Sequence, residues 1–407
     1  MMRCGLLGEH LSHSYSPQIH ADLGDYSYDL FEISPENLPN FLKIGDFDAL
    51  NVTIPYKKAV MPYCAEISET ARRMGCVNTL VRRADGTLYG DNTDCDGFAW
   101  LLQREGGIAA GEKALVLGSG GASGTAQAVL RALGAEVIEI SRSGENNYVN
   151  YTTHSDAVLL VNATPVGMYP NNGESLVDLG KLPRLRCVLD MVYNPSRTKL
   201  LLDAEARGVH YENGLPMLVA QAKRAAEIFT GNKIADKVCE RILCKLNKQM
   251  QNIILIGMPG CGKSTIGHLL AQTLGREFID ADAEIVSHIG DIPTFFAQHG
   301  EARFREVETE VLRELGKRSA CVIATGGGCV TREENYPLLH QNGIIVRISR
   351  ELSALPTHGR PISQSTALAD LFAVRDPMYR RFADVEIQNN ANPEAAVEEI
   401  VTQLSLL

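Results

Sequence analysis

Hydrophobic residues along this chain gather in short runs that alternate with amphipathic, helix-like stretches. In the first half, runs rich in β-branched residues occupy 112–120, 135–141, 157–164 and 187–193. In the second half, similar runs occupy 251–260, 276–282, 320–328 and 343–349. Residues 123–135, between two of these runs, have the composition of a helix. This rhythm predicts βαβ units, and therefore an α/β fold with parallel sheets.

The chain is too long for one ordinary core, because 407 residues usually form two or three domains. A polar stretch without aromatic residues, CKLNKQMQ at 244–251, separates the two series of runs. We therefore expect a domain boundary in this stretch, with 1–247 on one side and 248–407 on the other.

The composition changes the picture only in what it excludes. A hydrophobic content of 45% and a charged content of 22% are typical of globular proteins, and the net charge of −10 argues against nucleic acid or an anionic membrane as main partner. The sequence shows no membrane-length apolar run, no signal-peptide pattern and no CxxC pair among its ten cysteines. We expect a cytoplasmic protein with free thiols that binds neither nucleic acid nor membrane; its oligomeric state is not indicated.

A phosphate-binding motif stands at the start of the second half. Gly257, Gly262, Lys263 and Ser264 match G-x-x-x-x-G-K-[ST] directly after an apolar run and before a helix-like stretch, 263–275. In this pattern the backbone N–H groups face phosphate oxygens, the lysine reaches the β- and γ-phosphates, and the hydroxyl ligates Mg²⁺. The motif predicts a nucleotide site.

Later features narrow the chemistry to phosphoryl transfer. Asp280 and Asp282 end a predicted strand, where side chains two apart face the same side. One carboxylate can support Mg²⁺ while the other accepts a proton from a hydroxyl, although a lone D-x-D would equally fit a helix cap. Arg305 and Glu308 share a helical face, and the glycines at 326–328 allow a ligand to approach the backbone closely.

These motifs, followed by R-P-I and R-D-P-M-Y, occur in the order found in shikimate kinase, and the resemblance spans 252–407. It implies a P-loop kinase domain with a parallel sheet that uses ATP and Mg²⁺. The ATP-binding residues implied are Gly260, Cys261, Gly262, Lys263, Ser264, Thr265 and Arg360. The shikimate-binding residues implied are Asp282, Arg305, Gly327 and Arg375. Asp282 and Lys263 would be catalytic, and Ser264 and Asp280 would serve Mg²⁺.

The first half carries a second glycine-rich loop. Gly118, Gly120 and Gly121 lie between an apolar run and a helix-like stretch, as a pyrophosphate site requires, although a flexible turn is the alternative. The next run ends in Ser141, Arg142 and Ser143, where an acidic residue would favour NAD and an arginine suits the 2′-phosphate of NADP. We expect an NADP(H) site.

Residues 3–245 resemble shikimate dehydrogenase through H-S-Y-S-P, N-V-T-I-P-Y-K, V-N-T and N-T-D-C-D-G, in family order. The resemblance implies a catalytic α/β domain at 1–100 and 214–247 and a Rossmann domain at 101–213, with Lys57 as catalytic acid/base and Asp94 as its partner. The substrate-binding residues implied are Ser14, Ser16, Thr53, Asn78, Asp94, Tyr193 and Gln221. The cofactor-binding residues implied are Gly118, Ser119, Gly120, Gly121, Ala122, Ser141, Arg142, Ser143, Met191 and Gly214.

Together the two resemblances imply a bifunctional enzyme. It would reduce 3-dehydroshikimate to shikimate with NADPH and then phosphorylate shikimate with ATP. Three alternatives stay open: a quinate/shikimate dehydrogenase that uses NAD, fused to a kinase; a P-loop phosphotransferase for another substrate; and a regulatory binding protein derived from decayed copies of these enzymes.

Overall fold

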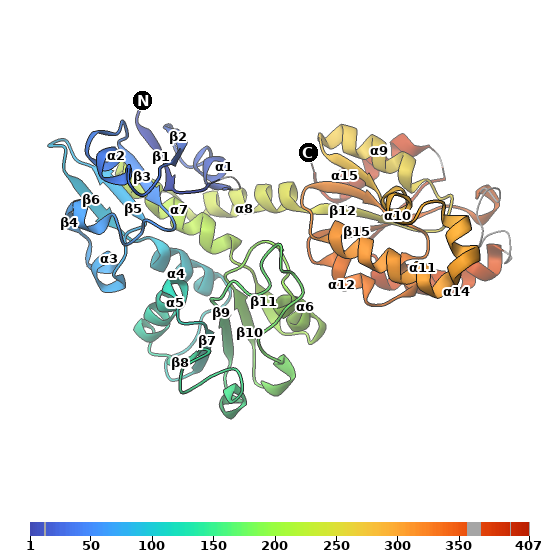
Figure 1. The fold of residues 1–407 in the computed structure, drawn as a ribbon, viewed down its shortest axis with the longest axis horizontal. Coiled ribbons are helices and arrows are strands. Elements are labelled where there is room, and N and C mark those ends of the chain that lie inside the picture. The colour runs from blue at the N-terminus through green and yellow to red at the C-terminus, as the bar shows by residue number, and fades with distance from the viewer. Residues whose placement is uncertain (12–13, 356–367, 391, 407) are drawn as a thin grey trace. The chain divides into compact units, whose positions relative to one another are not determined.

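The computed structural model describes residues 1–11, 14–355, 368–390 and 392–406. The chain divides into two compact units (Figure 1). The first unit comprises Met1–Val166, Glu174–Tyr193 and Asp203–Lys245, and the second comprises Gly167–Gly173, Asn194–Leu202 and Leu246–Leu407. Over the described residues the strands form three sheets, two of them entirely parallel, which confirms the predicted α/β class.

The first sheet is mixed and has the strand order β2-β1-β3-β5-β6-β4. Its strands are β1 (Arg3–Gly8), β2 (Ser27–Glu32), β3 (Ala49–Val52), β4 (Cys64–Ile67), β5 (Thr79–Arg82) and β6 (Leu88–Asp91). The helices that follow these strands are α1 (Ser16–His20), α2 (Leu38–Ile44), α3 (Glu69–Met74) and α4 (Asp94–Arg104). Of these, α3 has both end signals: Ser68 caps its start, and Gly75 ends it in the left-handed conformation.

The second sheet has the order β11-β10-β9-β7-β8, with all its strands parallel. Its elements are β7 (Lys113–Leu117), α5 (Gly121–Ala132), β8 (Glu136–Ile140), β9 (Leu159–Asn162), β10 (Cys187–Asp190), α6 (Lys199–Ala206) and β11 (His210–Glu212). The chain runs from β7 to β8 on one side and then returns to β9 on the other. This reversal is a topological switch point, where ligands bind beyond the carboxyl ends of the strands.

After the second sheet, the chain continues into two long helices, α7 (Leu215–Thr230) and α8 (Asp236–Met250). Helix α7 packs against α4, and the crossing is close at Gly97, where a Cβ would lie 2.7 Å from the Met217 carbonyl oxygen. Helix α8 runs through most of the polar stretch 244–251 in which we placed the domain boundary. The boundary after residue 247 remains a prediction.

The third sheet has the order β13-β14-β12-β15-β16, again with all its strands parallel. Its strands are β12 (Asn252–Ile256), β13 (Glu277–Asp280), β14 (Cys321–Ala324), β15 (Gly343–Ser349) and β16 (Val385–Gln388). Its helices are α9 (Lys263–Leu274), α10 (Ala281–Ile289), α11 (Ile292–Gly316), α12 (Asn335–His340), α14 (Leu368–Phe382) and α15 (Pro393–Gln403). Short 3₁₀ turns are η1 (Met61–Tyr63), η2 (Tyr151–His154), η3 (Leu179–Lys181), η4 (Cys329–Thr331) and η5 (Leu352–Ala354).

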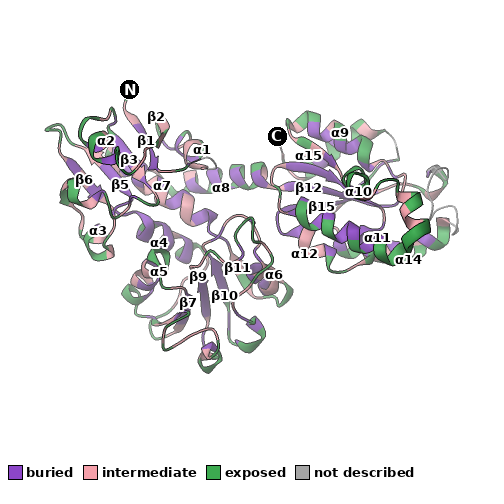
Figure 2. Ribbon diagram, viewed as in Figure 1, coloured by how far each residue is buried: buried purple, intermediate pink, exposed green. Residues whose placement is uncertain are grey.

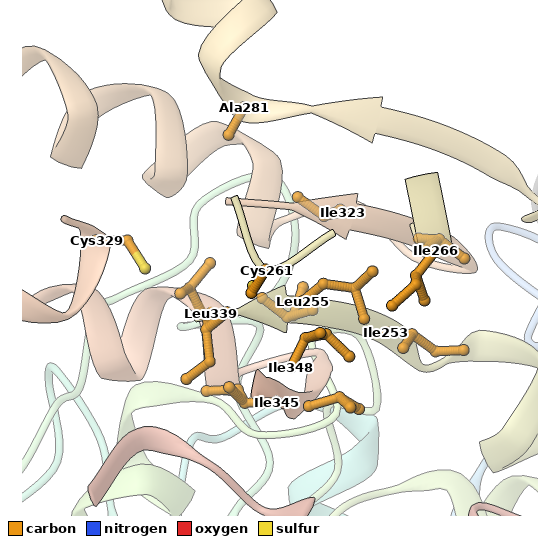
Figure 3. Close-up of a cluster of buried hydrophobic side chains, with 14 of the residues drawn as sticks. Ile253, Leu255, Cys261, Ile266, Ala281, Ile323, Cys329, Leu339, Ile345 and Ile348 are labelled. Carbon is orange, nitrogen blue, oxygen red and sulfur yellow. The ribbon is translucent and has the colours of Figure 1, made fainter. Parts of the chain in front are cut away.

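The strands carry the core. Figure 2 shows the central strands as buried and the helices as buried on one side only, which is why the strands read as continuous apolar runs in the sequence. In the third sheet, Ile253 and Leu255 of β12 lie among Ile323 of β14 and Ile345 of β15 (Figure 3). The carboxyl ends of these buried strands therefore emerge side by side from a rigid core.

Candidate active sites

One edge of the first sheet gathers the predicted catalytic residues. In the register of the strands, Leu7 lies opposite Val52, and Thr79 lies opposite both Asn51 and Asp91. The carboxyl ends of β1, β3 and β6 therefore meet the start of the antiparallel strand β5. Segments that are distant in the sequence leave the sheet together at this edge.

Lys57 and Asp94 form an ion pair at this edge. Lys57 Nζ lies 2.7 Å from Asp94 Oδ2, and Asn78 Nδ2 donates to the other carboxylate oxygen at 2.8 Å. Asn78 is itself fixed, because its Oδ1 accepts from the Thr93 backbone N–H at 2.9 Å. The Asp94 side chain is 13% exposed and that of Lys57 is 31% exposed. The carboxylate is thus the more buried partner of the pair and the ammonium group the more exposed one.

Ser14 lies just before α1, and Ser16 is the first residue of that helix. The Ser16 backbone N–H donates to Ser14 Oγ at 3.2 Å. Between them, Tyr15 packs edge-on against Tyr193, with ring centroids 6.3 Å apart. Burial raises the pKa of the Tyr193 hydroxyl, so this group stays a neutral hydrogen-bonding partner. The contact brings the segment after β10 to the serines.

Thr53 and Gln221 lie on either side of the ion pair in the sequence. Thr53 follows β3 directly, and its N–H donates to the Leu7 carbonyl at 2.9 Å. Gln221 belongs to α7 and packs at Gly97, where a Cβ would lie 2.9 Å from the Gln221 Cβ. Gly97 is one helical turn from Asp94 on α4, so Gln221 packs within one turn of Asp94.

The glycine-rich loop after β7 is tightly packed at Gly118 and has free space at Gly120 and Gly121. Gly118 adopts φ 106°, and a Cβ there would lie 2.9 Å from Thr164 Cγ2. In contrast, a Cβ at Gly120 or Gly121 would meet nothing within 4 Å, and both precede or begin α5. Ser119 and Ala122 are exposed beside them. The space fits a pyrophosphate at a helix N-terminus, as NADP(H) requires.

A chain of side-chain hydrogen bonds fixes this loop from behind. Gln127 Nε2 donates to Glu139 Oε2 at 2.6 Å and to Ser123 Oγ at 3.0 Å, and Ser123 Oγ donates to the Gly118 carbonyl at 2.6 Å. Because the peptide unit is planar and trans, a Gly118 carbonyl held inward points the N–H of Ser119 outward. The sequence analysis missed Ser123 and Gln127, whose residue types have no recognisable cofactor signature.

The remaining predicted cofactor residues lie at neighbouring strand ends. Ser141 follows β8, is buried, and donates its N–H to the Asn146 carbonyl at 3.1 Å. Arg142 and Ser143 are exposed next to it. Met191 and Gly214 touch after β10 and β11, since a Cβ at 214 would lie 2.1 Å from the Met191 oxygen. An exposed arginine beside the loop suits a 2′-phosphate.

The second unit contains a cavity of about 580 Å³ at the carboxyl edge of its sheet. The loops after β12, β13, β14 and β15 all contribute to it. Among the residues predicted from the sequence, the cavity is lined by Gly260, Gly262, Lys263, Ser264, Thr265, Asp280, Asp282, Arg305, Gly327 and Arg375. Arg360 lies outside the described residues.

The phosphate loop depends on its glycines. Gly257 has φ 146°, and a Cβ there would lie 2.3 Å from the Ile348 carbonyl oxygen. Lys263 is buried and donates to the carbonyls of Gly257 and Met258, at 3.0 and 3.2 Å. The side chain of Cys261 lies in the hydrophobic core (Figure 3), so only the backbone of this residue is available to a phosphate.

The two aspartates are positioned differently from our expectation. Asp280 ends β13, but Asp282 lies in the first turn of α10, so the alternation of strand side chains is not what aligns them. Asp280 is the helix cap: its Oδ1 accepts from the N–H of Asp282 at 3.0 Å, while its Oδ2 accepts from Ser264 Oγ at 2.7 Å. Asp280 therefore caps α10 and contacts Ser264 at the same time, so the helix-cap alternative and the functional one do not exclude each other. Both carboxylates line the cavity.

The adjacent hydroxyl and carboxylate of Ser264 and Asp280 are oxygen ligands of the kind that Mg²⁺ takes. Among the described residues, no three His, Cys, Asp or Glu side chains cluster as a metal site. A magnesium ion would thus depend on nucleotide phosphates and water for its other ligands, which is its usual mode of binding.

Arg305 and Glu308 share a helical face, as predicted, and form a buried ion pair with Nη1 and Oε2 2.7 Å apart. The glycine run after β14 makes room for these side chains: a Cβ at Gly328 would lie 2.0 Å from the Arg305 guanidinium, and one at Gly326 would lie 2.7 Å from Asp282 Oδ1. Burial raises the pKa of Glu308, and Asp282 adds to the effect while Arg305 opposes it. Arg375 donates to the Gly327 carbonyl at 3.1 Å and completes this end of the cavity.

No helix in the described parts of the chain combines the length and apolar character needed to cross a membrane. All ten cysteines are free thiols.

Comparison with known proteins finds a family match in each unit. Residues 6–80 match the family model of the shikimate dehydrogenase substrate binding domain, and residues 259–405 match that of shikimate kinase. A shikimate dehydrogenase (NADP(+)) of Shouchella clausii is 37% identical over 270 residues, covering 59% of this chain and 96% of the relative.

Two solved structures show the same similarity. A chorismate mutase/shikimate 5-dehydrogenase fusion protein from Clostridium acetobutylicum matches with a TM-score of 0.57 and 36% identity, over 60% of this chain and 97% of that one. The shikimate 5-dehydrogenase of Thermus thermophilus, solved in complex with NADP(H) and shikimate, matches with a TM-score of 0.55 and 33% identity, over 60% and 98%.

Proposed function

We propose, from the premise that this chain belongs to the shikimate dehydrogenase family and carries a shikimate kinase domain, that it catalyses two consecutive reactions. The first unit reduces 3-dehydroshikimate to shikimate with NADPH. The second unit transfers a phosphoryl group from ATP to the 3-hydroxyl of shikimate. The product of the first reaction is the substrate of the second.

In the reduction, NADPH would supply the hydride for the carbonyl carbon. Lys57 donates a proton to the carbonyl oxygen, and Asp94, 2.7 Å from Nζ, stabilises the protonated lysine before transfer. Because Lys57 is the more exposed partner, it regains its proton from water after turnover. Ser14, Ser16, Thr53, Asn78, Tyr193 and Gln221 bind and orient the substrate.

In the phosphoryl transfer, ATP would supply the phosphoryl group, and Ser264 and Asp280 would hold Mg²⁺, which would neutralise phosphate charge. Asp282 accepts the proton of the attacking hydroxyl, and Arg305 and Arg375 bind the substrate carboxylate. Lys263 exchanges the loop carbonyls that it now contacts for phosphate oxygens. Gly260 to Thr265 and Arg360 complete the ATP site.

The observation that carries the proposal is that both sites keep their reactive groups in mutual contact within one chain. Lys57 pairs with Asp94, and Ser264 bonds to Asp280, each at 2.7 Å. A regulatory protein derived from decayed enzymes has no need to preserve such contacts. We further propose that the protein works in the cytoplasm, where NADPH and ATP are both available.

The test is one incubation of the purified protein with 3-dehydroshikimate, NADPH, ATP and Mg²⁺, followed by mass spectrometry of the products. Shikimate 3-phosphate is the expected product. Shikimate alone would contradict the kinase half, and the absence of any product would contradict both halves. An incubation with quinate and NAD⁺ in place of 3-dehydroshikimate and NADPH tests the oxidative alternative. Measuring ATP turnover in the absence of shikimate tests for a phosphotransferase that acts on another substrate.

A further inference from the structure

The cavity of the second unit contains an arginine that the sequence analysis did not single out. Arg350 follows β15 directly and lines the cavity together with the phosphate loop. Strand β15 pairs with β12, with Arg347 opposite Ile256, so Arg350 leaves the sheet beside the start of that loop. The end of β15 and the start of the phosphate loop are in contact there, because Gly257 has no side chain to separate it from the Ile348 carbonyl.

The backbone on both sides of Arg350 is fixed. The Asn389 N–H donates to the Ser349 carbonyl at 2.8 Å, and the Glu351 N–H donates to Asn390 Oδ1 at 3.0 Å. The side chain of Asn389 also donates to the carbonyl of Cys261, in the phosphate loop, at 2.7 Å. Asn389, at the end of β16, therefore bonds both to the segment that carries Arg350 and to the phosphate loop, and so fixes their relative position.

The other cationic side chains described in this cavity already have partners. Lys263 donates to carbonyls of its own loop, Arg305 pairs with acidic side chains of its own helix, and Arg375 donates to the Gly327 carbonyl. The Nε of Arg350, in contrast, is buried and has no hydrogen-bond acceptor within the described part of the chain. A buried guanidinium N–H without an acceptor is unfavourable, and an anionic ligand would satisfy it.

We propose that Arg350 binds phosphate oxygens of ATP from the β15 side of the cavity. The proposal rests on the kinase function proposed above, and it assigns the arginine to the nucleotide, since it adjoins the phosphate loop. A guanidinium group suits this role because it can donate two parallel hydrogen bonds to a phosphate and keeps its charge at any physiological pH. Such a cation also stabilises the charge that develops on the transferred group.

The test compares Arg350→Ala and Arg350→Lys with Arg313→Ala, a matched loss of an exposed arginine outside the cavity. We expect Arg350→Ala to lower kcat/KM for ATP about 10²-fold, as loss of a charge-stabilising donor does elsewhere. The KM for shikimate and the rate of 3-dehydroshikimate reduction should not change. Arg350→Lys should recover part of the loss, and Arg313→Ala should behave as the wild type.

Binding titrations with ATP, ADP and adenosine locate the contact. The affinity loss of Arg350→Ala should be largest for ATP and absent for adenosine. Wild-type kinetics and binding, an equal loss for adenosine, or a raised KM for shikimate instead would each overturn the proposal. If the wild type made no shikimate phosphate, the proposed function would fail, while the ATP titration would still decide whether Arg350 binds the nucleotide. Circular dichroism and the reductase rate establish that each variant is folded.

Discussion

At the scale of single residues, the proposed function assigns a different lysine to each active site. Lys57, which pairs with Asp94, is the proposed proton donor of the reduction, and Lys263 lies in the phosphate loop. Lys57→Ala should lower the rate of reduction about 10²- to 10⁴-fold, because it removes the proton donor. It should leave phosphorylation of added shikimate unchanged, and Lys263→Ala should give the reverse pattern. Separate assays of both reactions on each variant check this, and loss of both activities in one folded variant would contradict the assignment.

The bonds behind the glycine-rich loop yield a second prediction. Ser123→Ala removes the hydroxyl that holds the Gly118 carbonyl, so the N–H of Ser119 loses its fixed direction. We expect the KM for NADPH to rise about tenfold, the worth of roughly one net hydrogen bond, with little change in kcat. Initial-rate kinetics at saturating 3-dehydroshikimate measure this.

Thr125→Val is the matched control, because that hydroxyl bonds to Gly121 in the same helix and not to Gly118. If this variant raised the KM equally, or if Ser123→Ala lowered only kcat, general disturbance of the helix would explain the effect better than positioning of the loop.

The residues found by sequence analysis and those missed differ in a physical way. Lys57, Asp94 and Lys263 could be predicted because their proposed chemistry restricts the residue type within recognisable motifs. Ser123 and Arg350 were missed because their roles come from packing: one faces back toward a carbonyl, and the other is placed by a strand pairing that sequence patterns do not reveal.

At the scale of elements, sequence patterns predicted strands better than the details of their ends. The runs around 113–117 and 252–256 are strands, as expected, because buried parallel strands must be apolar throughout. We expected Asp282 to face the same side as Asp280 because both would lie on one strand. That reason was wrong, because α10 begins at Ala281, one residue before Asp282. The side chain of Asp280 starts α10 by capping it. The alternation of residues along a strand does not predict where such a helix begins.

The packing of α1, β2 and α7 makes the first unit sensitive to acid. His20 of α1 is buried, stacks on Tyr28 at 3.9 Å, faces Phe229, and lies 2.7 Å from the Tyr26 hydroxyl. Burial disfavours the imidazolium ion and lowers the pKa of His20 to about 3 from 6.5, although a hydrogen bond with Asn51 opposes the shift. The unfolded chain therefore binds more protons between these values, and stability falls as the pH drops below 6.5.

Between pH 7 and pH 5 this residue should lower the free energy of unfolding of the first unit by about 2 kcal/mol. Urea unfolding of the wild type and of His20→Phe at both pH values measures this change in the free energy of unfolding. The change between pH 7 and pH 5 should be about 2 kcal/mol smaller in His20→Phe than in the wild type. His10→Asn, at an exposed position, is the control. An equal pH dependence in all three proteins would contradict a buried, neutral His20.

At the scale of the whole molecule, the chain joins units that have separate cores. Three clusters of buried side chains lie at 7–88, 98–189 and 253–400, each within one unit. Because each unit buries its own apolar surface, each should unfold as its own cooperative transition.

Calorimetry of the full chain should therefore show two transitions. NADP⁺ should raise the temperature of one and MgATP that of the other, with about 2.7 kcal/mol of stabilisation at a ligand concentration of 100 times Kd. A single transition that both ligands shift would show that the units unfold together. The assignment of each transition follows from which enzymatic activity is lost across it.

The glycine run after β14 has a consequence for the gene. Apart from silent third-base changes, a single-base change in a glycine codon gives Ala, Val, Ser, Arg, Cys, Trp, Asp, Glu or a stop. Each of these amino acids brings a Cβ, which would lie 2.7 Å from Asp282 Oδ1 at position 326 and 2.0 Å from the Arg305 guanidinium at position 328. Amino-acid replacement at these two codons therefore requires the side chain of Asp282 or Arg305 to move. The first half of the gene carries the same kind of codon at Gly214, because a Cβ there would lie 2.1 Å from the Met191 carbonyl oxygen.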